Sequence, residues 1–305
     1  MNRDRGSAFM FHYIQSGGSK KRRFFFDLDN FEHQIKALDE RFGVYRVGEL
    51  EDLSRLESPA KCLLTFDDGL LEHYEKILPI LESLQYLGIF FIPTLPLRES
   101  HLLNVHAIHK LETDFTPLQF AQGINESDRE ELELFDHLDP IYLNYQAPDL
   151  FTRLRTLINF NRTYDQGREL LQKYFESLYG HHQDLFAQEW YISKENVGEI
   201  LKCGMLVGNH TVDHRALDSL SFPELQHQIV DSQNYFKQEF DFTPTLLSYP
   251  FGKNPNFNLQ TKKLLIESGI KYGFTAKEGH YNQFLKSAPT MLPRFDCNFI
   301  PYFIQ

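Results

Sequence analysis

The sequence predicts an α/β barrel, a fold in which parallel strands alternate with helices. Short apolar runs followed by polar or glycine-rich residues recur along the chain, and helix-period segments lie between most of them. The runs are apolar on both faces, which is typical of parallel strands covered by helices. The number of candidate strands favours a barrel over an open sheet; they span residues 8–13, 62–66, 89–93, 205–208, 245–249, 272–275 and, more weakly, 290–293.

Four helices are expected between these strands. Residues 28–41 follow Asp27 and Asp29, either of which is placed to cap a helix. Residues 70–87 carry leucines on one face and should end at Gly88. Residues 221–240 open with Ser221 and Glu224, the spacing of a capping box, and residues 258–268 end at Gly269.

The strand pattern disappears between residues 95 and 190. Helical periodicity is clearest at residues 127–137, 148–159 and 164–179. We therefore expect residues 1–305 to form a single barrel with a helical insertion at 95–190. The insertion would act as a lid or as the contact of a homo-oligomer.

Composition excludes several functional classes. The chain has 305 residues and a formal net charge of -11, which disfavours a nucleic-acid partner because an acidic surface repels phosphates. The three cysteines form no CxxC pair, so neither a disulfide framework nor a cysteine zinc site is indicated. No stretch approaches the roughly 20 apolar residues of a transmembrane helix, and no signal-peptide core is visible. A cytoplasmic location is the expectation.

Side chains that can bind a metal or transfer a proton lie directly after several of the predicted strands. His12 ends the first strand and Asp67 and Asp68 end the second. His210 and His214 follow the fourth strand. Further residues follow the fifth and last strands, namely Tyr249, Pro250, Phe251, Arg294 and Asp296. In parallel barrels the loops at this end converge and build the active site.

Asp67 and Asp68 precede Gly69, which permits a tight turn. Adjacent residues at a strand end point in opposite directions, so one carboxylate can bind a metal while the other accepts a proton. The alternative is a structural turn in which one aspartate caps the following helix.

His210 and His214 are four residues apart, so one helical turn would place both imidazoles on one face. Together with one aspartate they form a ligand set that suits a divalent cation and leaves coordination positions open. Zinc is the first expectation, with Co²⁺, Ni²⁺ or Mn²⁺ as alternatives. A histidine pair alone is weak, but the pair combined with Asp67-Asp68-Gly69 is a strong signal.

Three segments, residues 65–69, 210–214 and 248–252, resemble the first three motifs of the polysaccharide deacetylase family, the NodB-homology carbohydrate esterases. The resemblance covers residues 7–94 and about 190–297. It implies a distorted seven-stranded barrel and metal-dependent hydrolysis of an acetamido group on a sugar.

The same resemblance implies roles for individual residues. Asp68, His210 and His214 would bind the metal, and Asp67 would be the general base. The third motif, Tyr249-Pro250-Phe251, would contact substrate, with the backbone N–H of Phe251 holding the oxyanion.

The sequence departs from the common family pattern in two places. Residues 245–248 lack the usual arginine, and the C-terminus lacks the usual catalytic histidine. A branch of the family places that histidine in the first strand, which His12 matches, so His12 is the candidate general acid. Arg294 would then orient Asp67, and Asp296 would compensate a protonated His12. A structural ion pair that closes the barrel is the alternative for Arg294 and Asp296.

The sequence thus predicts an N-deacetylase acting on an amino sugar or glycan, in the biosynthesis or modification of a surface polysaccharide. Two alternatives stay open: a metal-dependent amidohydrolase on a non-sugar amide, and a relative that binds glycan or metal without catalysis. The remaining histidine pairs, His106 with His109 and His181 with His182, are expected to be solvated surface residues.

Overall fold

The computed structural model describes residues 6–15, 25–50, 53, 61–134, 149–252 and 259–304. Seven parallel strands form one sheet in the order β8-β7-β6-β5-β4-β1-β9. These strands are β1 (Ala8–Phe11), β4 (Leu63–Phe66), β5 (Gly88–Ile92), β6 (Leu206–Asn209), β7 (Leu246–Ser248), β8 (Tyr272–Phe274) and β9 (Phe295–Asp296). A parallel pair, β2 (Tyr13–Gln15) and β3 (Phe25–Asp27), lies beside it. The predicted α/β class and the first six strand positions are confirmed.

The seventh strand is not where the sequence predicted it. Residues Pro289–Met291 form a 3₁₀ turn, and β9 pairs with β1 only after Pro293. The apolar run at 290–293 reflects burial, since Leu292 is fully buried, and Pro293 has no N–H for a strand ladder. Leu292 makes one parallel bridge to Phe274 in β8, so the stretch from Leu292 to Asp296 contacts both edges of the sheet and gives a distorted barrel.

Most of the predicted barrel helices form, with two changes. Helix α1 begins after Asp27, whose carboxylate accepts a hydrogen bond from the backbone of Asp29 at 3.0 Å. The helix after β4 ends at Gln85 in a left-handed conformation, three residues before the expected Gly88, which instead begins β5. Both this helix and the one after Ser221 contain a π-helical turn. The barrel helices are α1 (Leu28–Phe42), α2 (Leu78–Leu84), α10 (Lys194–Lys202), α11 (Phe222–Gln226), α12 (Ser232–Phe240), α13 (Leu259–Glu267) and α14 (Ile300–Ile304).

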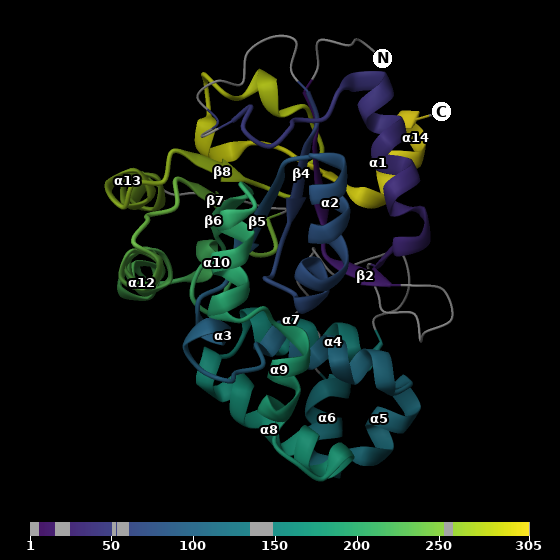
Figure 1. Ribbon diagram of the computed structural model, residues 1–305. Helices are drawn as coiled ribbons and strands as arrows, with labels where there is room; N and C mark the ends of the chain where they lie inside the picture. The colour runs from purple at the N-terminus through teal and green to yellow at the C-terminus, as the bar shows by residue number, and fades with distance from the viewer. Residues whose placement is uncertain are drawn as a thin grey trace.

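The described residues between β5 and α10 contain helices and no strand of the sheet. These helices are α3 (Leu95–Arg98), α4 (Asn104–Asp114), α5 (Pro117–Gly123), α6 (Glu126–Leu134), α7 (Leu150–Phe160), α8 (Tyr164–Tyr179) and α9 (Ala187–Trp190). Helix α8 has the predicted bounds, whereas the predicted ends at 135–137 and 148 lie outside the described residues. Helices α4 to α9 gather below the sheet in Figure 1, at the end where β5 runs into α3.

The helical segment 95–190 has its own apolar core, which includes Phe120, Phe151 and Phe175. Two barrel residues, Tyr13 and Leu70, belong to the same cluster. Tyr191 also bridges Leu70, directly after Asp67-Asp68-Gly69. The segment is therefore packed onto the end of the barrel where the strands terminate. None of the helices in the described ranges is long and apolar enough to cross a membrane.

The barrel core contains a stack of phenylalanines from three neighbouring strands. Phe66 of β4 lies between Phe11 of β1 and Phe90 of β5, with ring centroids 5.1 Å and 5.0 Å away. All three rings are buried, so this ladder ties the strands that precede the candidate site into one packed layer.

We expect Phe66→Ala to lower the free energy of unfolding by about 3–5 kcal/mol, because the cavity it leaves cannot collapse between two stacked rings. Phe222→Ala is the matched control: Phe222 is 45% exposed, so its loss should cost about 0.5 kcal/mol or less. Urea unfolding measures both. Equal losses for the two variants would contradict the packing described here.

Candidate active site

The residues predicted from the strand ends do converge at one end of the barrel. Asp67 and Asp68 follow β4, His210 and His214 follow β6, and Phe251 follows β7. They line one cavity of about 190 Å³, together with His12, Tyr249, Arg294 and Asp296 from the barrel and Val105, His109 and Arg155 from the helical segment.

Asp68, His210 and His214 form a compact set of possible metal ligands. All three side chains are buried, and their ligand atoms lie within 4.8 Å of one another. Asp68 Oδ1 is 3.1 Å from His210 Nε2 and 3.3 Å from His214 Nε2. Ligands at about 2.1 Å from a tetrahedral ion are about 3.4 Å apart, so this spacing fits a divalent cation.

The orientation of His210 also fits metal binding. Its Nδ1 lies 2.8 Å from the backbone carbonyl of Ser248, to which an Nδ1–H would donate. In the neutral imidazole, that hydrogen bond leaves Nε2, the atom facing Asp68, without a proton and free to act as a ligand.

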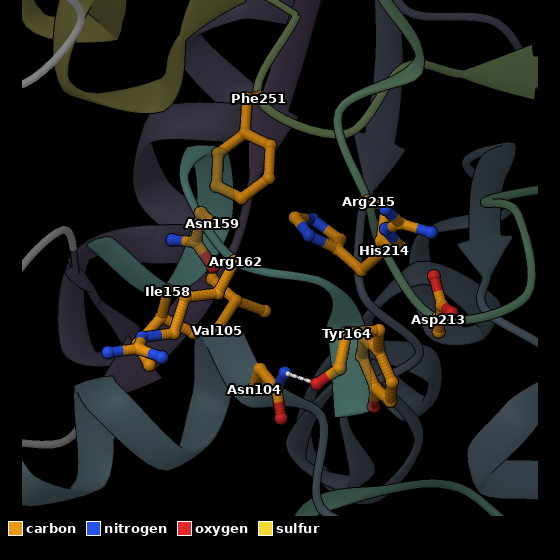
Figure 2. A pocket seen from close by; sticks show the side chains of 10 residues that line it. All are labelled: Asn104, Val105, Ile158, Asn159, Arg162, Tyr164, Asp213, His214, Arg215 and Phe251. Atoms are coloured by element: carbon orange, nitrogen blue, oxygen red, sulfur yellow. Dashed lines mark hydrogen bonds between the residues drawn. The ribbon is translucent and has the colours of Figure 1, made fainter. Parts of the chain in front are cut away.

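His214 borders a second, smaller pocket of about 20 Å³, shown in Figure 2. Its Nδ1 is buried and has no hydrogen-bond partner among the described residues, as is the case for Asn104 Oδ1 and Asp213 Oδ1 nearby. Figure 2 shows this pocket between Phe251 and His214 on the barrel side and α4 and α7 on the other. Burial raises the pKa of Asp213 to about 6.

Charge at the site follows from burial and from close contacts. Burial alone would raise the pKa of Asp68, but hydrogen bonds and charge interactions with its neighbouring histidines hold that pKa well below the ordinary value. Burial lowers the pKa of His214 to about 4. Asp68 is therefore ionised and His214 neutral near neutral pH, which are the forms that ligate a metal.

Backbone strain is concentrated here. Six non-glycine residues in the described ranges have positive φ, and two of these, Gln85 and Asp241, end helices. The other four are Asp68, Thr211, His214 and Phe251, with φ between 61° and 75°. Strained backbone conformations cluster at functional sites because the surrounding fold has to hold them in place.

Asp67 forms a buried, bidentate ion pair with Arg294. Arg294 Nη1 donates to Asp67 Oδ1 at 2.8 Å and Nη2 donates to Oδ2 at 2.7 Å. Arg294 also donates to the hydroxyls of Thr65 and Ser248 and to the carbonyl of Thr275. Arg294, which comes from just before β9, thus binds both carboxylate oxygens of Asp67.

The pair controls the ionisation of Asp67. Burial by itself raises the pKa of Asp67, but the charge and hydrogen bonds of Arg294 outweigh burial and lower it to about 2. Since the folded-state pKa lies below the ordinary value of 3.8, ionised Asp67 stabilises the fold above about pH 4. That contribution is lost as the pH falls towards 2.

His12 and Asp296 both line the cavity, in different ways. His12 Nε2 lies 3.8 Å from Asp67 Oδ2, and the His12 side chain is 31% exposed. Asp296 Oδ1 accepts hydrogen bonds from the backbone and side chain of Asn298, as the cap of a short turn.

The third motif provides one wall of the cavity. The Tyr249 hydroxyl donates to the Thr290 carbonyl at 2.8 Å, which holds the loop after β7. Pro250 accepts a hydrogen bond from the backbone of Gly252 at 2.8 Å. The ring of Phe251 lies edge-on to His214 at 4.9 Å, and its backbone N–H makes no hydrogen bond to the described part of the chain.

The expectation that His106 and His109 are solvated surface residues is wrong. Both lie on α4, three residues apart and therefore on one face of the helix. His106 is 1% exposed and reaches Asp68, while half-buried His109 lines the cavity. His182, by contrast, has a side chain that is 52% exposed, as expected. The three-residue spacing of His106 and His109 was the only feature of the sequence that could have placed them at the site, because the insertion carries no motif.

Comparison with known proteins agrees with the fold. The family model for polysaccharide deacetylase matches residues 161–273. YxkH of Bacillus subtilis, provisionally named a polysaccharide deacetylase, is 29% identical over 89 residues, which is 29% of this chain and 31% of that protein. Over these stretches the chain is similar to polysaccharide deacetylases. The aligned stretch spans less than a third of this curated relative.

Solved structures share the architecture over nearly the whole chain. Streptococcus pyogenes deacetylase PplD in complex with acetate has a TM-score of 0.57 at 17% identity, covering 96% of this chain and 92% of that one. IcaB from Ammonifex degensii has a TM-score of 0.56 at 15% identity, with 99% and 96% coverage. These likenesses show the fold.

We expect Asp67→Asn and Arg294→Met to be strongly non-additive in the free energy of unfolding. Arg294→Met leaves a buried carboxylate unpaired and should cost about 3–5 kcal/mol. The double variant should cost less than the sum of the two, by about 0.5–3 kcal/mol, because neither charge is then left alone. Denaturant unfolding of the four proteins measures this, and additive costs would contradict a direct pair.

Proposed function

We propose that this protein is a metal-dependent N-deacetylase that removes an acetyl or similar acyl group from an amino sugar or glycan. The observation that carries the proposal is the placement of Asp67 beside the Asp68, His210 and His214 set in one cavity. Two adjacent aspartates thus have different surroundings, one bound by Arg294 and the other by histidines.

The ligand set suits zinc first, and Co²⁺, Ni²⁺ or Mn²⁺ as alternatives. A divalent ion held by Asp68, His210 and His214 would supply Lewis-acid chemistry, polarising the acyl carbonyl and making water easier to deprotonate.

Asp67 is the general base of the proposed reaction. Its pKa of about 2 keeps it ionised at any working pH, so it is always ready to accept a proton. The same low pKa makes Asp67 a weak base. It can therefore deprotonate only a water molecule whose own pKa has been lowered, as a bound divalent ion would do. Arg294 occupies both carboxylate oxygens and sets their orientation, which is a positioning role.

His12 is the proposed general acid, which assigns the protein to the branch of the family with this histidine in the first strand. As water adds to the acyl carbon and the C–N bond breaks, the amine nitrogen needs a proton, and His12 supplies it from the open side of the cavity. Asp296 lines the same cavity, and its carboxylate is the proposed compensating charge for His12. The Phe251 backbone N–H is free to hold the oxyanion.

The cavity suits an uncharged acylated sugar. Arg155 lines it but is paired with Glu112 at 2.6 Å, so the helical segment adds little net charge there. The net charge of the chain, -11, disfavours polyanionic glycans and suits a product that becomes cationic on deacetylation. We place the reaction in the biosynthesis or modification of a surface polysaccharide, in the cytoplasm.

We expect acetate release from N-acetylglucosamine and its oligomers to require a divalent metal. A chelator should abolish release, and Zn²⁺ or Co²⁺ should restore it, because Lewis-acid activation cannot be replaced by the protein side chains. Acetate assay after dialysis measures this. Turnover of a simple anilide but of no sugar would indicate an amidohydrolase instead, and bound metal without turnover of any amide would indicate a non-catalytic relative.

Single substitutions should separate the roles of the three central groups. Asp67→Asn should lose turnover and keep metal, Asp68→Asn should lose metal, and His12→Ala should lower kcat by about 10²–10⁴-fold while keeping metal. Elemental analysis and acetate release measure both properties. His227→Ala is the control, since His227 is exposed and pairs with Asp231 on its own helix.

Metal loss in Asp67→Asn, with Asp68→Asn still loaded, would reverse the two assignments. Near wild-type hydrolysis by His12→Ala would remove His12 from the mechanism.

A further inference from the structure

Helix α4 of the helical segment sends a histidine to the metal site. His106 is 1% exposed, and its Nε2 lies 3.3 Å from Asp68 Oδ2. This nitrogen has no hydrogen-bond partner of good geometry among the described residues, so Asp68 is the polar group it faces.

The two oxygens of Asp68 face different partners. Oδ1 lies near Nε2 of both His210 and His214, whereas Oδ2 lies near His106. In the part of the chain that the structure describes, the one group of ligand atoms within 4.8 Å of one another excludes His106. His106 is therefore placed to hold the carboxylate, and the metal would sit on the opposite oxygen.

Hydrogen bonds behind His106 determine where its proton lies. The backbone N–H of Leu103 donates to the Tyr191 hydroxyl oxygen at 3.2 Å. That hydroxyl contacts His106 Nδ1, and burial raises the pKa of Tyr191 well above its ordinary value, so the hydroxyl keeps its proton. Tyr191 thus donates to Nδ1, and the proton of neutral His106 is on Nε2, facing Asp68.

Tyr191, which holds His106, is itself fixed to the barrel. Tyr191 forms a bridge with Leu70, and the next backbone N–H, from Ile192, donates to the Gly69 carbonyl at 3.0 Å. The residues that hold His106 are thus fixed to the turn that carries Asp68.

We propose that His106 is a positioning residue of the metal site, whose Nε2–H fixes the Asp68 carboxylate so that Oδ1 faces the metal. The inference rests on the proposed metal site but on no particular substrate. It makes the helical segment part of the metal centre, because His106 of that segment contacts Asp68, a member of the ligand set that follows β4 and β6. Partners that orient metal ligands typically contribute 10- to 100-fold in metal affinity.

The experiment measures Co²⁺ dissociation constants by competition with a chelating indicator, together with the visible Co²⁺ spectrum and thermal unfolding. His106→Leu should weaken binding by about 10- to 100-fold. His106→Gln can still donate from a nitrogen near the same position and should recover most of that loss. Tyr191→Phe should weaken binding by less, because it removes only the hydrogen bond that fixes the tautomer of His106.

His101→Gln is the matched control, because His101 is a buried histidine of the same segment that contacts Tyr164 and not Asp68. It should leave Co²⁺ affinity unchanged even if it lowers the melting temperature. Asp68→Asn identifies the site in the same assay, since it must lose Co²⁺ if the metal site is assigned correctly.

Wild-type affinity in folded His106→Leu and Tyr191→Phe, with Asp68→Asn unable to bind, would overturn the role of His106 and leave the proposed function standing. Retention of Co²⁺ by Asp68→Asn would overturn the metal site itself. A Co²⁺ spectrum that shows one nitrogen ligand fewer in His106→Gln would make His106 a ligand, which also contradicts the positioning role. If His106→Leu fails to fold, the Co²⁺ affinity of Tyr191→Phe and the Co²⁺ spectrum of His106→Gln still test the role of His106: wild-type affinity in the first, or one nitrogen ligand fewer in the second, would overturn it.

Discussion

The buried ion pair between Arg294 and Asp67 is the interaction on which the rest of the site depends. A buried guanidinium is costly unless its donors are paired, and here they reach Asp67, Thr65, Ser248 and Thr275. These partners lie in or just after β4, β7 and β8, while Arg294 itself precedes β9. One side chain thus connects strands that are far apart in the sheet order, and it orients the carboxylate at their centre.

The helical segment adds the second constraint. Its core includes barrel residues Tyr13 and Leu70, so it is packed against the strand ends and cannot be regarded as a separate surface feature. It covers the side of the cavity that the strands leave open, and Val105, His109 and Arg155 line that side. Through His106 it also reaches Asp68. Strained conformations at Asp68, His214 and Phe251 lie at this junction, where packing from both sides holds them.

Much of the site could be predicted from the sequence. Asp67-Asp68-Gly69 and His210 to His214 lie directly after strands, and parallel strands bring their carboxyl ends together whatever the intervening length. The strand at 290–293 was misplaced because periodicity reports burial and cannot tell which buried residues also pair. His106 and His109 were misjudged because an amphipathic helix shows which face is apolar but not what that face packs against.

The sequence by itself determined the α/β class, the order of strands and helices, and the identity of the acids and histidines at the strand ends. Local patterns suffice for these, since each depends on neighbours a few residues away. Only the tertiary structure decided that Arg294 pairs with Asp67, and that His106 faces Asp68. Arg294 and Asp67 are 227 positions apart, and His106 comes from a helix outside the barrel. Both contacts form only because the barrel and its helical segment pack together.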